Sequence, residues 1–446
     1  MKIFEDLIVK VSDFVCGYPL FILLIGGGLF FLLYSNFIPF RYYGRAIKEL
    51  RKKNEEGEGQ ISSFEALTSA IAATVGMGNI AGVAIALTMG GPGAIFWMWV
   101  SSIVGMSTKF FEGVVSVMYK GKDNEGTIQG GPMYAITNGL GKKWKPMAIF
   151  FSVFGLIGTL CLMQANQLTE AVTTVFIEPS GIENTLWVRF LIGVVICVIV
   201  AVVILGGIKR IAKISSKLVP IMVGLYFILV LYIIVTNLSE VPSVFVSIFK
   251  GAFNWEAGIG GIVGVAIIGA RRAALVNEAG IGTASMMHGA SKNNKPVREG
   301  LIAMIGPSID SGLVCTLTAI AILLKGNYNV DGVKGLEIAL KSFDAAIPDY
   351  GAYFLMGIVF IFAFSTMFSY SYYGVKCAGY LFGAKNAKYY NYFYLIMLIV
   401  AAMIPLKAAV GLIDLAYALM AIPTMLTLFI LAPKVKVATK EYLKNK

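Results

Sequence analysis

Apolar runs of about twenty residues recur along this chain of 446 residues and limit its possible folds more than any other feature. Each run is long enough to cross the hydrocarbon core of a bilayer, roughly 30 Å thick, as an α-helix. Backbone polar groups find no water there, so only helices and closed barrels span it, and the runs lack strand-like alternation. We count eleven runs, over residues 18–36, 61–89, 93–119, 147–176, 186–206, 214–236, 257–280, 299–324, 351–380, 390–406 and 408–432.

Charged residues make up only 14% of the chain, whereas a soluble domain averages about 25%. Most of the surface must therefore face lipid. We predict an all-α polytopic membrane protein with about eleven transmembrane helices. No nucleophile–base pair, metal-ligand cluster or phosphate loop stands out, and no repeated filter loop is present. A membrane-embedded enzyme and a passive channel are therefore only distant alternatives.

The N-terminal segment and the cysteines predict neither a cleavable signal nor a disulfide. Residues 4–13 (FEDLIVKVSD) suggest a short amphipathic helix, and the apolar run behind it lacks a small-residue cleavage pattern. The five cysteines are dispersed through apolar runs without a C-x-x-C pair, so we expect small core residues and no metal site. We expect His288, the only histidine, in a solvated loop.

The net charge of +12 is concentrated in alternate loops, which argues against a nucleic-acid partner. The loops between these are acidic or balanced. The positive-inside rule places the N-terminus outside and the C-terminus in the cytoplasm. The basic segments are residues 41–53, 142–145, 209–217, 292–298, 376–388 and 434–446.

The ten spans after the first divide into two sets of five. Because five is odd, the two sets must insert with opposite orientations. The expected parts are an N-terminal segment with an amphipathic stretch, an accessory helix and a basic loop (1–60), a first repeat (61–236), a second, inverted repeat (257–432) and a basic tail (433–446).

Each set begins with a span that contains several glycines: TVGMGNIAG (74–82) in the first and GIGGIVGVAIIGA (258–270) in the second. Each glycine costs a helix interior roughly 1 kcal/mol relative to alanine. A broken helix also frees polar groups that lipid cannot satisfy, so these groups must face a cavity. Interrupted spans at matching positions of opposed halves point to a transporter's binding site. The alternative is close helix packing through small residues.

The first interruption suits a zwitterion beside an alkali cation. A half-helix that begins near Gly78 presents N–H groups to a carboxylate, and carbonyls from Ala72 to Val75 suit sodium. Hydroxyl and carbonyl oxygens without a carboxylate fit sodium better than a divalent ion. Ser and Thr hydroxyls can instead bond within their own helix. Polar side chains at this depth on two further spans are Gln164, Gln167, Thr174, Ser365, Thr366 and Tyr370.

Several ionisable residues fall within or beside the spans, and such residues are functional candidates. Asp310 is the deepest, with Arg272 on the neighbouring span as its candidate partner. We favour a structural or gating ion pair, and a proton relay through Asp310 or Glu278 is the alternative.

At these residues the sequence resembles the alanine or glycine:cation symporter family of the amino acid–polyamine–cation superfamily. The similarity runs in collinear order from about residue 60 to 432. The matching strings are VGMGNIAGVAIALTMGGPGAIFWMW (75–99), QGGPMY (129–134), MQAN (163–166), GGIKRIAK (206–213), RRAALVNEAGIGTA (271–284), PVREGLIAMIG (296–306) and FAFSTMFSYSYYG (362–374).

The resemblance implies a LeuT-like fold of five plus five inverted helices preceded by one extra helix. It also implies sodium-coupled import of a small neutral amino acid, alanine or glycine, through a bacterial or archaeal plasma membrane, with no cofactor beyond the coupling ion. Carried over by position, the sodium ligands are carbonyls of Ala72, Val75 and Phe362 and hydroxyls of Ser365 and Thr366. The residues expected at the substrate are Gly76, Met77, Gly78, Asn79, Ile157, Cys161, Gln164, Gly264, Ile268 and Tyr370.

The chain departs from the family pattern at two positions that should border the pocket. Met77 stands where a threonine is common, and Tyr370 stands where a tryptophan is common. A glutamine:sodium symporter of the same family therefore stays open as an alternative, as does a proton-coupled amino-acid carrier. The sequence leaves the oligomeric state open.

Overall fold

The computed structural model describes residues 14–52, 57–254, 258–326, 328 and 335–444, and this part of the chain is helical apart from one short hairpin. Eight of its helices are long and apolar enough to cross a membrane, or up to ten when each of two bent pairs counts as one span. We predicted eleven. The run over 390–406 forms α22 (Tyr389–Met403), whose 15 residues extend only about 22 Å.

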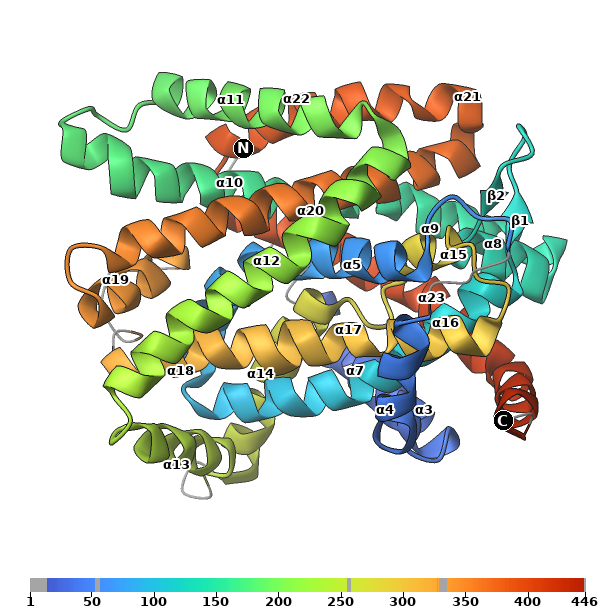
Figure 1. Cartoon of the computed structure of the whole chain (residues 1–446), viewed down its shortest axis with the longest axis horizontal. Helices are drawn as coiled ribbons and strands as arrows, with labels where there is room; N and C mark the ends of the chain where they lie inside the picture. The colour runs from blue at the N-terminus through green and yellow to red at the C-terminus, as the bar shows by residue number, and fades with distance from the viewer. Residues whose placement is uncertain (1–13, 53–56, 255–257, 327, 329–334, 445–446) are drawn as a thin grey trace.

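The helices of the two expected halves lie together in one bundle (Figure 1). Those of the first half are α5 (Ser63–Thr74), η2 (Gly78–Gly82), α6 (Val83–Gly90), α7 (Gly93–Met118), α9 (Lys145–Gly158), α10 (Leu162–Val172), η5 (Thr173–Ile177), η6 (Glu178–Ser180), α11 (Leu186–Ile204) and α12 (Gly207–Thr236). Those of the second half are α14 (Gly258–Asn277), α15 (Thr283–Gly289), α16 (Pro296–Ala303), α17 (Ile305–Pro307), η8 (Ser308–Val314), α18 (Cys315–Lys325), α20 (Gly351–Phe382), α22 and α23 (Leu406–Lys444).

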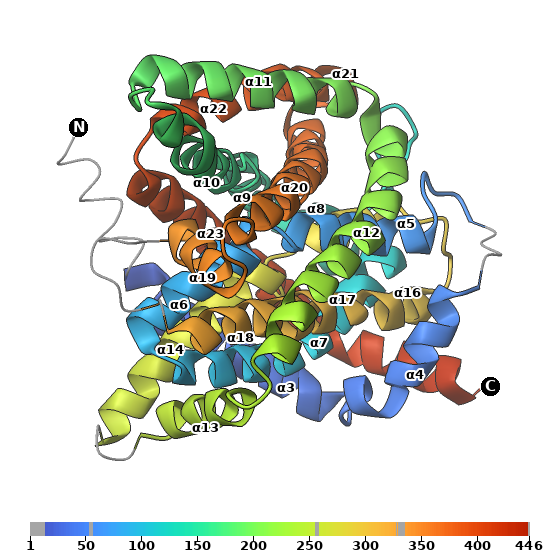
Figure 2. The same cartoon turned by 60° about the vertical axis from the view of Figure 1, so that its left-hand side comes forward.

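The halves are interleaved rather than side by side. From the first half, α5 packs against α12 and also against α20 of the second half. Another first-half helix, α7, packs against α14 and α16 of the second. Figure 2 shows α12 and α20 crossing the same face of the bundle. The first interrupted span therefore lies inside the bundle between elements of both halves.

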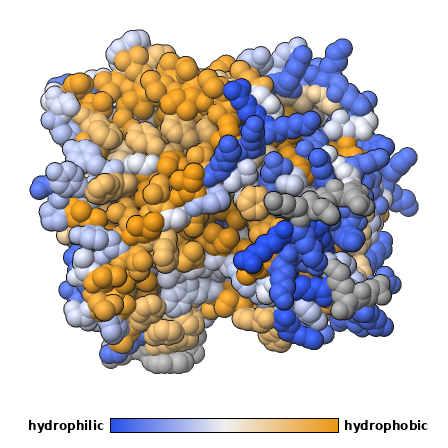
Figure 3. Space-filling view, in the orientation of Figure 1, coloured by the Kyte–Doolittle hydropathy of each residue, from blue (hydrophilic) through white to orange (hydrophobic). Residues whose placement is uncertain are grey.

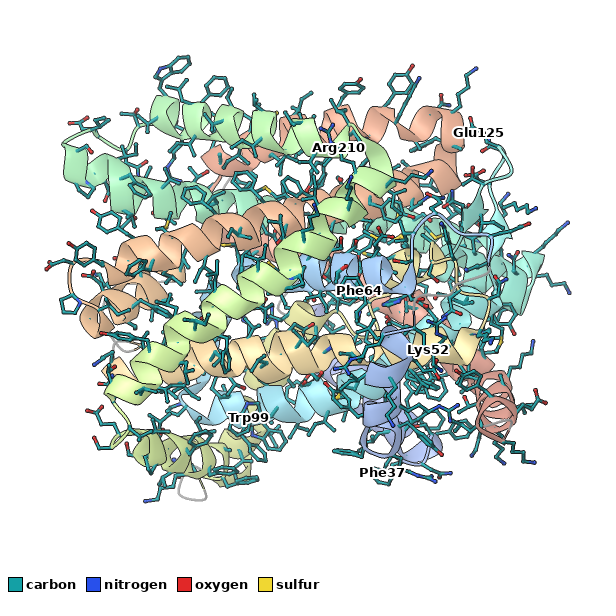
Figure 4. The ribbon with its side chains drawn as sticks, in the orientation of Figure 1. Phe37, Lys52, Phe64, Trp99, Glu125 and Arg210 are labelled. Atoms are coloured by element: carbon teal, nitrogen blue, oxygen red, sulfur yellow. The ribbon has the colours of Figure 1, made fainter. Side chains whose placement is uncertain are left out.

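Ahead of these halves, an accessory segment bends sharply at the edge of the bundle. Its elements are α2 (Tyr18–Phe21), η1 (Ile22–Gly26), α3 (Gly27–Tyr34) and α4 (Ile38–Leu50). Between α3 and α4 the chain turns by 78°, with Asn36 and Phe37 in the left-handed backbone region. In Figure 4, Phe37 lies at this turn, and Lys52 follows the end of α4 beside α16. Arg298 of α16 donates to Lys52 O at 2.9 Å and so ties the segment to the bundle.

Short elements lie at the two ends of the bundle (Figure 1). One end carries α13 (Val241–Ala252) and α19 (Leu336–Ala346). The other, which we call the basic end, carries β1 (Gly121–Lys122), β2 (Ile128–Gln129), α8 (Pro132–Tyr134), η3 (Ala135–Leu140), η4 (Lys142–Trp144), α21 (Ala384–Ala387) and the C-terminal part of α23.

Apolar side chains cover the flank of the molecule between its ends. Figure 3 shows hydrophobic residues over most of this face and hydrophilic residues gathered at the basic end. The long helix α11 illustrates the pattern, since Leu191, Val195, Val198 and Val202 are all exposed. In water such a surface is unfavourable, but in lipid it needs no partner. The distribution fits a multi-pass membrane protein.

One expected interruption lies elsewhere. The glycine-rich stretch 258–270 does not break its span, because α14 runs as one helix from Gly258 to Asn277. The break follows at Glu278–Gly282, before α15 begins. Each half thus starts with an interrupted helix, as predicted, but the second interruption is eight residues later than the glycines suggested.

Candidate functional site

The first interruption spans three residues between the end of α5 at Thr74 and the start of η2 at Gly78, and the helix bends there by 52°. The side chain of Asn79 holds it in place: Oδ1 accepts from the Gly76 amide at 2.8 Å, and Nδ2 donates to Asp310 O at 3.2 Å. The N–H groups of Met77 and Gly78 lie at the start of the new half-helix, which supplies them with no acceptor. They lie where a bound carboxylate would be stabilised.

The five residues expected to bind sodium are all buried, and Thr366 contacts two of the others beside this break: Ala72, Val75, Phe362, Ser365 and Thr366. Thr366 Oγ1 lies 2.9 Å from Phe362 O in its own helix and 3.0 Å from Ala72 O in α5. Ser365 Oγ lies 3.0 Å from Phe362 O. Both hydroxyls thus bond within their own helix, which was the alternative to a role in sodium binding. The Thr366 hydroxyl also bridges α20 and α5.

Gly76 allows α20 to approach the break this closely. A Cβ atom built on Gly76 would lie 2.3 Å from Thr366 Oγ1, well inside van der Waals contact. The glycine thus serves a specific contact between the interruption and the Thr366 hydroxyl. The Ala72 and Phe362 carbonyls and the Thr366 hydroxyl thus bring together neutral oxygen atoms of the kind that suits an alkali cation, and Ser365 Oγ, which shares the Phe362 carbonyl, also lies 3.5 Å from Met222 Sδ.

The second interruption is held by charged side chains from the other half. Glu278, Gly280 and Gly282 all have positive φ, at 53°, 89° and 95°, so the helix cannot continue through them. From α7, Lys109 Nζ donates to Glu278 O at 3.0 Å. Also from α7, Glu112 Oε1 accepts from the Gly280 amide at 2.6 Å. These two bonds satisfy backbone groups that lipid would leave without partners.

A cavity of about 60 Å³ lies between the two interruptions. The first break contributes Ala73, Thr74, Gly76, Gly78 and Gly82, α10 contributes Met163 and Gln164, and the second broken span contributes Arg272, Leu275, Val276 and Glu278. The rest of the wall is Tyr370, Ile413, Asp414 and Tyr417. Both the main-chain groups of the first break and side chains of either charge therefore border one space.

A chain of hydroxyls connects this cavity with the second interruption. The Tyr417 hydroxyl lies 2.5 Å from the Tyr370 hydroxyl and 3.5 Å from Glu278 Oε1. On its other oxygen, Glu278 accepts a hydrogen bond from Thr283 of α15. Glu278 is therefore both a backbone anchor and an acidic group next to the cavity.

An ion pair lies on the α13 side of the cavity. Arg271 Nη2 of α14 is 3.3 Å from Asp414 Oδ2 of α23. The pair lies two turns before the break in α14, and the neighbouring Arg272 lines the cavity itself. It links α14 to α23 beside the cavity, which Asp414 also lines.

Of the ten residues expected at the substrate, the structure places four in the cavity wall: Gly76, Gly78, Gln164 and Tyr370. Met77 and Asn79 are buried in the first break. Cys161 is buried in the break between α9 and α10, and Ile157 lies one turn earlier. Gly264 and Ile268 lie on the unbroken part of α14, so the predicted break at these residues is wrong, and their carbonyls are not freed for a substrate.

Two further interpretations change. His288 is not a solvated loop residue: it is buried in α15 with Nδ1 2.7 Å from Glu299 Oε1. Asp310 lies in η8, where its carboxylate accepts from the Ser311 amide, whereas Arg272 lines the cavity with Asp414. We also missed Tyr417, which nothing in its apolar run distinguishes. Arg272 and Asp414 were visible as charges within apolar spans.

Comparison with known families matches residues 1–446 to the family described as the sodium:alanine symporter family. The sodium/alanine symporter AgcS of Methanococcus maripaludis is 37% identical over 450 residues, which cover 98% of this chain and 97% of AgcS. The probable sodium/glutamine symporter GlnT of Bacillus subtilis is 31% identical over 448 residues, covering 100% of this chain and 92% of GlnT.

Among solved structures, that of MhsT in complex with L-phenylalanine matches with a TM-score of 0.60 at 13% identity. The match covers 85% of this chain and 98% of MhsT. At this identity the similarity concerns the fold alone, and it confirms the predicted LeuT-like architecture.

Proposed function

Because the chain belongs to the sodium:alanine symporter family, a family of sodium-coupled amino-acid symporters, we propose that it imports alanine or glycine with sodium by alternating access. The observation that carries the proposal is the contact of Thr366 with both Ala72 and Phe362 beside the first interruption. It brings neutral oxygen atoms, the ligands that suit sodium, to the same break that borders the cavity, and so supports the proposal.

Sodium and substrate would each order the same broken helix. The ion would use carbonyls at the end of α5, and the amino acid would use N–H groups at the start of η2. Each ligand then lowers the cost of binding the other, and this coupling is reciprocal by thermodynamic necessity. The C-terminal tail and basic end would face the cytoplasm, following the positive-inside rule.

The energetics suffice for uphill import. One charge moving through 100 mV supplies about 2.3 kcal/mol, and a tenfold sodium gradient adds about 1.4 kcal/mol. With one sodium per substrate, these terms sustain an accumulation of roughly several hundred-fold.

The size of the cavity favours a small substrate over glutamine. One water needs roughly 10–15 Å³ of such space, so about 60 Å³ holds about four to six atoms the size of water, which suits alanine better than the longer glutamine. Met77 is buried in the first break, and Tyr370 is buried in the cavity wall, so both side chains take up space next to the break. The named relatives include both an alanine and a glutamine symporter, so substrate size is the property to test.

Uptake by purified protein in liposomes tests the proposal. Labelled alanine should accumulate with external sodium and an inside-negative potential, and accumulation should collapse when choline replaces sodium. Unlabelled glycine should compete, and glutamine should compete poorly. Equal uptake in sodium and choline would refute the coupling, whereas stronger competition by glutamine would refute only the substrate.

Proton coupling is the second candidate, and Glu278 is the observation in its favour. This carboxylate reaches the cavity through Tyr417 and Tyr370. A proton-coupled carrier would accumulate alanine in choline medium when a pH gradient, acidic outside, is imposed. Glu278→Gln would abolish that accumulation. A sodium-coupled carrier would show no uptake under those conditions.

A further inference from the structure

A second, larger cavity of about 440 Å³ opens at the basic end, away from the site described above. Its walls are the end of α3, the start of α4 and the last turns of α23, and its floor is α7. The sharp turn at Asn36 and Phe37 directs α4 away from α3 and so leaves the space open. Figure 1 shows the C-terminal part of α23 emerging near α4.

The rim of this cavity is cationic. Arg41 comes from α4, while Lys436, Lys440 and Lys444 recur at intervals of four residues and therefore share one face of α23. Among the described residues, none of these four cations pairs with a carboxylate, and no Asp or Glu lines the cavity. Ser35, Asn36 and Thr439 add hydrogen-bonding groups to the same wall.

Two cation–π contacts hold the walls in position. Lys436 Nζ lies 4.1 Å from the Tyr34 ring centroid and joins α23 to α3. The Arg45 guanidinium lies 5.0 Å from the Tyr442 ring centroid and joins α4 to α23. Lys436 is therefore held in the wall of the cavity, on the helix face that it shares with Lys440 and Lys444.

The floor and one exit of the cavity are apolar. Phe110 and Phe111 of α7 and Ile38 of α4 are buried beneath the cations. From Tyr34 back along α3, Leu33, Phe30 and Leu29 are exposed and lead to the lipid-facing flank. A cationic rim above an aromatic floor, continuous with an apolar surface, matches an anionic head group joined to hydrocarbon.

We propose that this cavity binds one anionic phospholipid, with its phosphate between Arg41 and the α23 lysines and its acyl chains along α3. Basic pockets between transmembrane helices are typical sites for such head groups. Free phosphate would satisfy the rim but would leave the apolar floor without a partner. The lipid would come from the leaflet that faces the basic loops.

The bound lipid would connect the accessory segment with a helix of the transport site. Besides the rim lysines, α23 carries Asp414 and Tyr417, which line the central cavity, and Thr424, which donates to Ile281 O in the second interruption at 3.0 Å. Binding of anionic lipid does not depend on which substrate is carried, so its test is separate from that of the proposed function.

Native mass spectrometry of the delipidated full chain tests the proposal. Phosphatidylglycerol should bind as one tight equivalent, whereas phosphatidylcholine should not. Each lysine near an anionic head group is worth about fivefold in affinity, so Lys436→Gln with Lys440→Gln should weaken binding about 25-fold. Lys142→Gln with Lys143→Gln removes the same charge from an exposed segment of the same end and should change binding less than about twofold.

Lys436→Arg with Lys440→Arg keeps both positive charges and should therefore keep the affinity for phosphatidylglycerol. This control separates an effect of lost charge from an effect of misfolding. Equal weakening in both glutamine pairs would overturn the proposal, because it would indicate nonspecific surface attraction. So would equal binding of phosphatidylcholine, or full competition by millimolar inorganic phosphate, which would assign the site to a free anion.

Discussion

Replacing Thr366 with valine should remove one proposed sodium ligand while keeping the shape of the side chain. The Thr366 hydroxyl lies 3.0 Å from Ala72 O and 2.9 Å from Phe362 O, and the side chain is fully buried. A hydrogen-bond-type contact to a charged group contributes about 1.5–3 kcal/mol, so losing it should weaken sodium binding about 10- to 100-fold. Thr366→Ser retains the hydroxyl and is the matched control.

The assay is initial uptake of labelled alanine into liposomes at increasing sodium concentration. For Thr366→Val, the sodium concentration for half-maximal uptake should rise about 10- to 100-fold. The affinity for alanine at saturating sodium should change less than about threefold. Thr366→Ser should resemble the parent. An unchanged sodium dependence in a folded, active valine variant would show that the hydroxyl is not a ligand and that its contact with Ala72 is only structural.

The remaining predictions concern packing and charge around the two breaks. Gly76→Ala should abolish sodium-dependent uptake, because its Cβ would meet Thr366 Oγ1 at 2.3 Å, and adding Thr366→Ser should not restore it, since the oxygen remains. Tyr370→Ala should let amino acids with longer side chains compete for alanine uptake, and an unchanged competition profile would remove Tyr370 from the wall. Lys109→Met should lower the free energy of unfolding by about 3–5 kcal/mol, because Glu112 keeps a buried charge without its partner at 3.5 Å. Lys109→Met combined with Glu112→Gln should be more stable than Lys109→Met alone in thermal unfolding in detergent, and strict additivity of the two changes would contradict the pairing. His288→Gln should cost about 1–3 kcal/mol by removing the Glu299 contact, whereas a solvated histidine would tolerate the change.

The sequence was sufficient for features that depend on local composition. Span length and apolar content predicted the bundle, because lipid requires both properties within each segment. The first interruption was also readable, since Gly76, Gly78 and Asn79 lie together within one apolar run. Asn79 supplies its own local acceptor to Gly76, so the break is largely encoded within a few residues.

The features that the sequence left undetermined depend on distant partners. The second interruption is fixed by Lys109 and Glu112, which are about 170 residues away in the chain, and the glycines at 258–270 gave a stronger local signal than residues 278–282 did. His288 can be buried because Glu299, on another helix, accepts a hydrogen bond from its ring N–H group. A polar residue in a short connection reads as solvated unless its partner is known.

Each of the two interruptions is held by hydrogen bonds to the opposite half of the molecule. The break in the first half is fastened to the second half, because Asn79 donates to Asp310 O in η8. The break in the second half is fastened to the first half, because Lys109 and Glu112 of α7 hold Glu278 and Gly280. Any displacement of one half therefore changes the surroundings of the other half's break. Sodium would bind at the first break, and the cavity for the amino acid borders both breaks. Binding of either ligand would therefore affect how the two halves sit relative to each other, as coupling by alternating access requires.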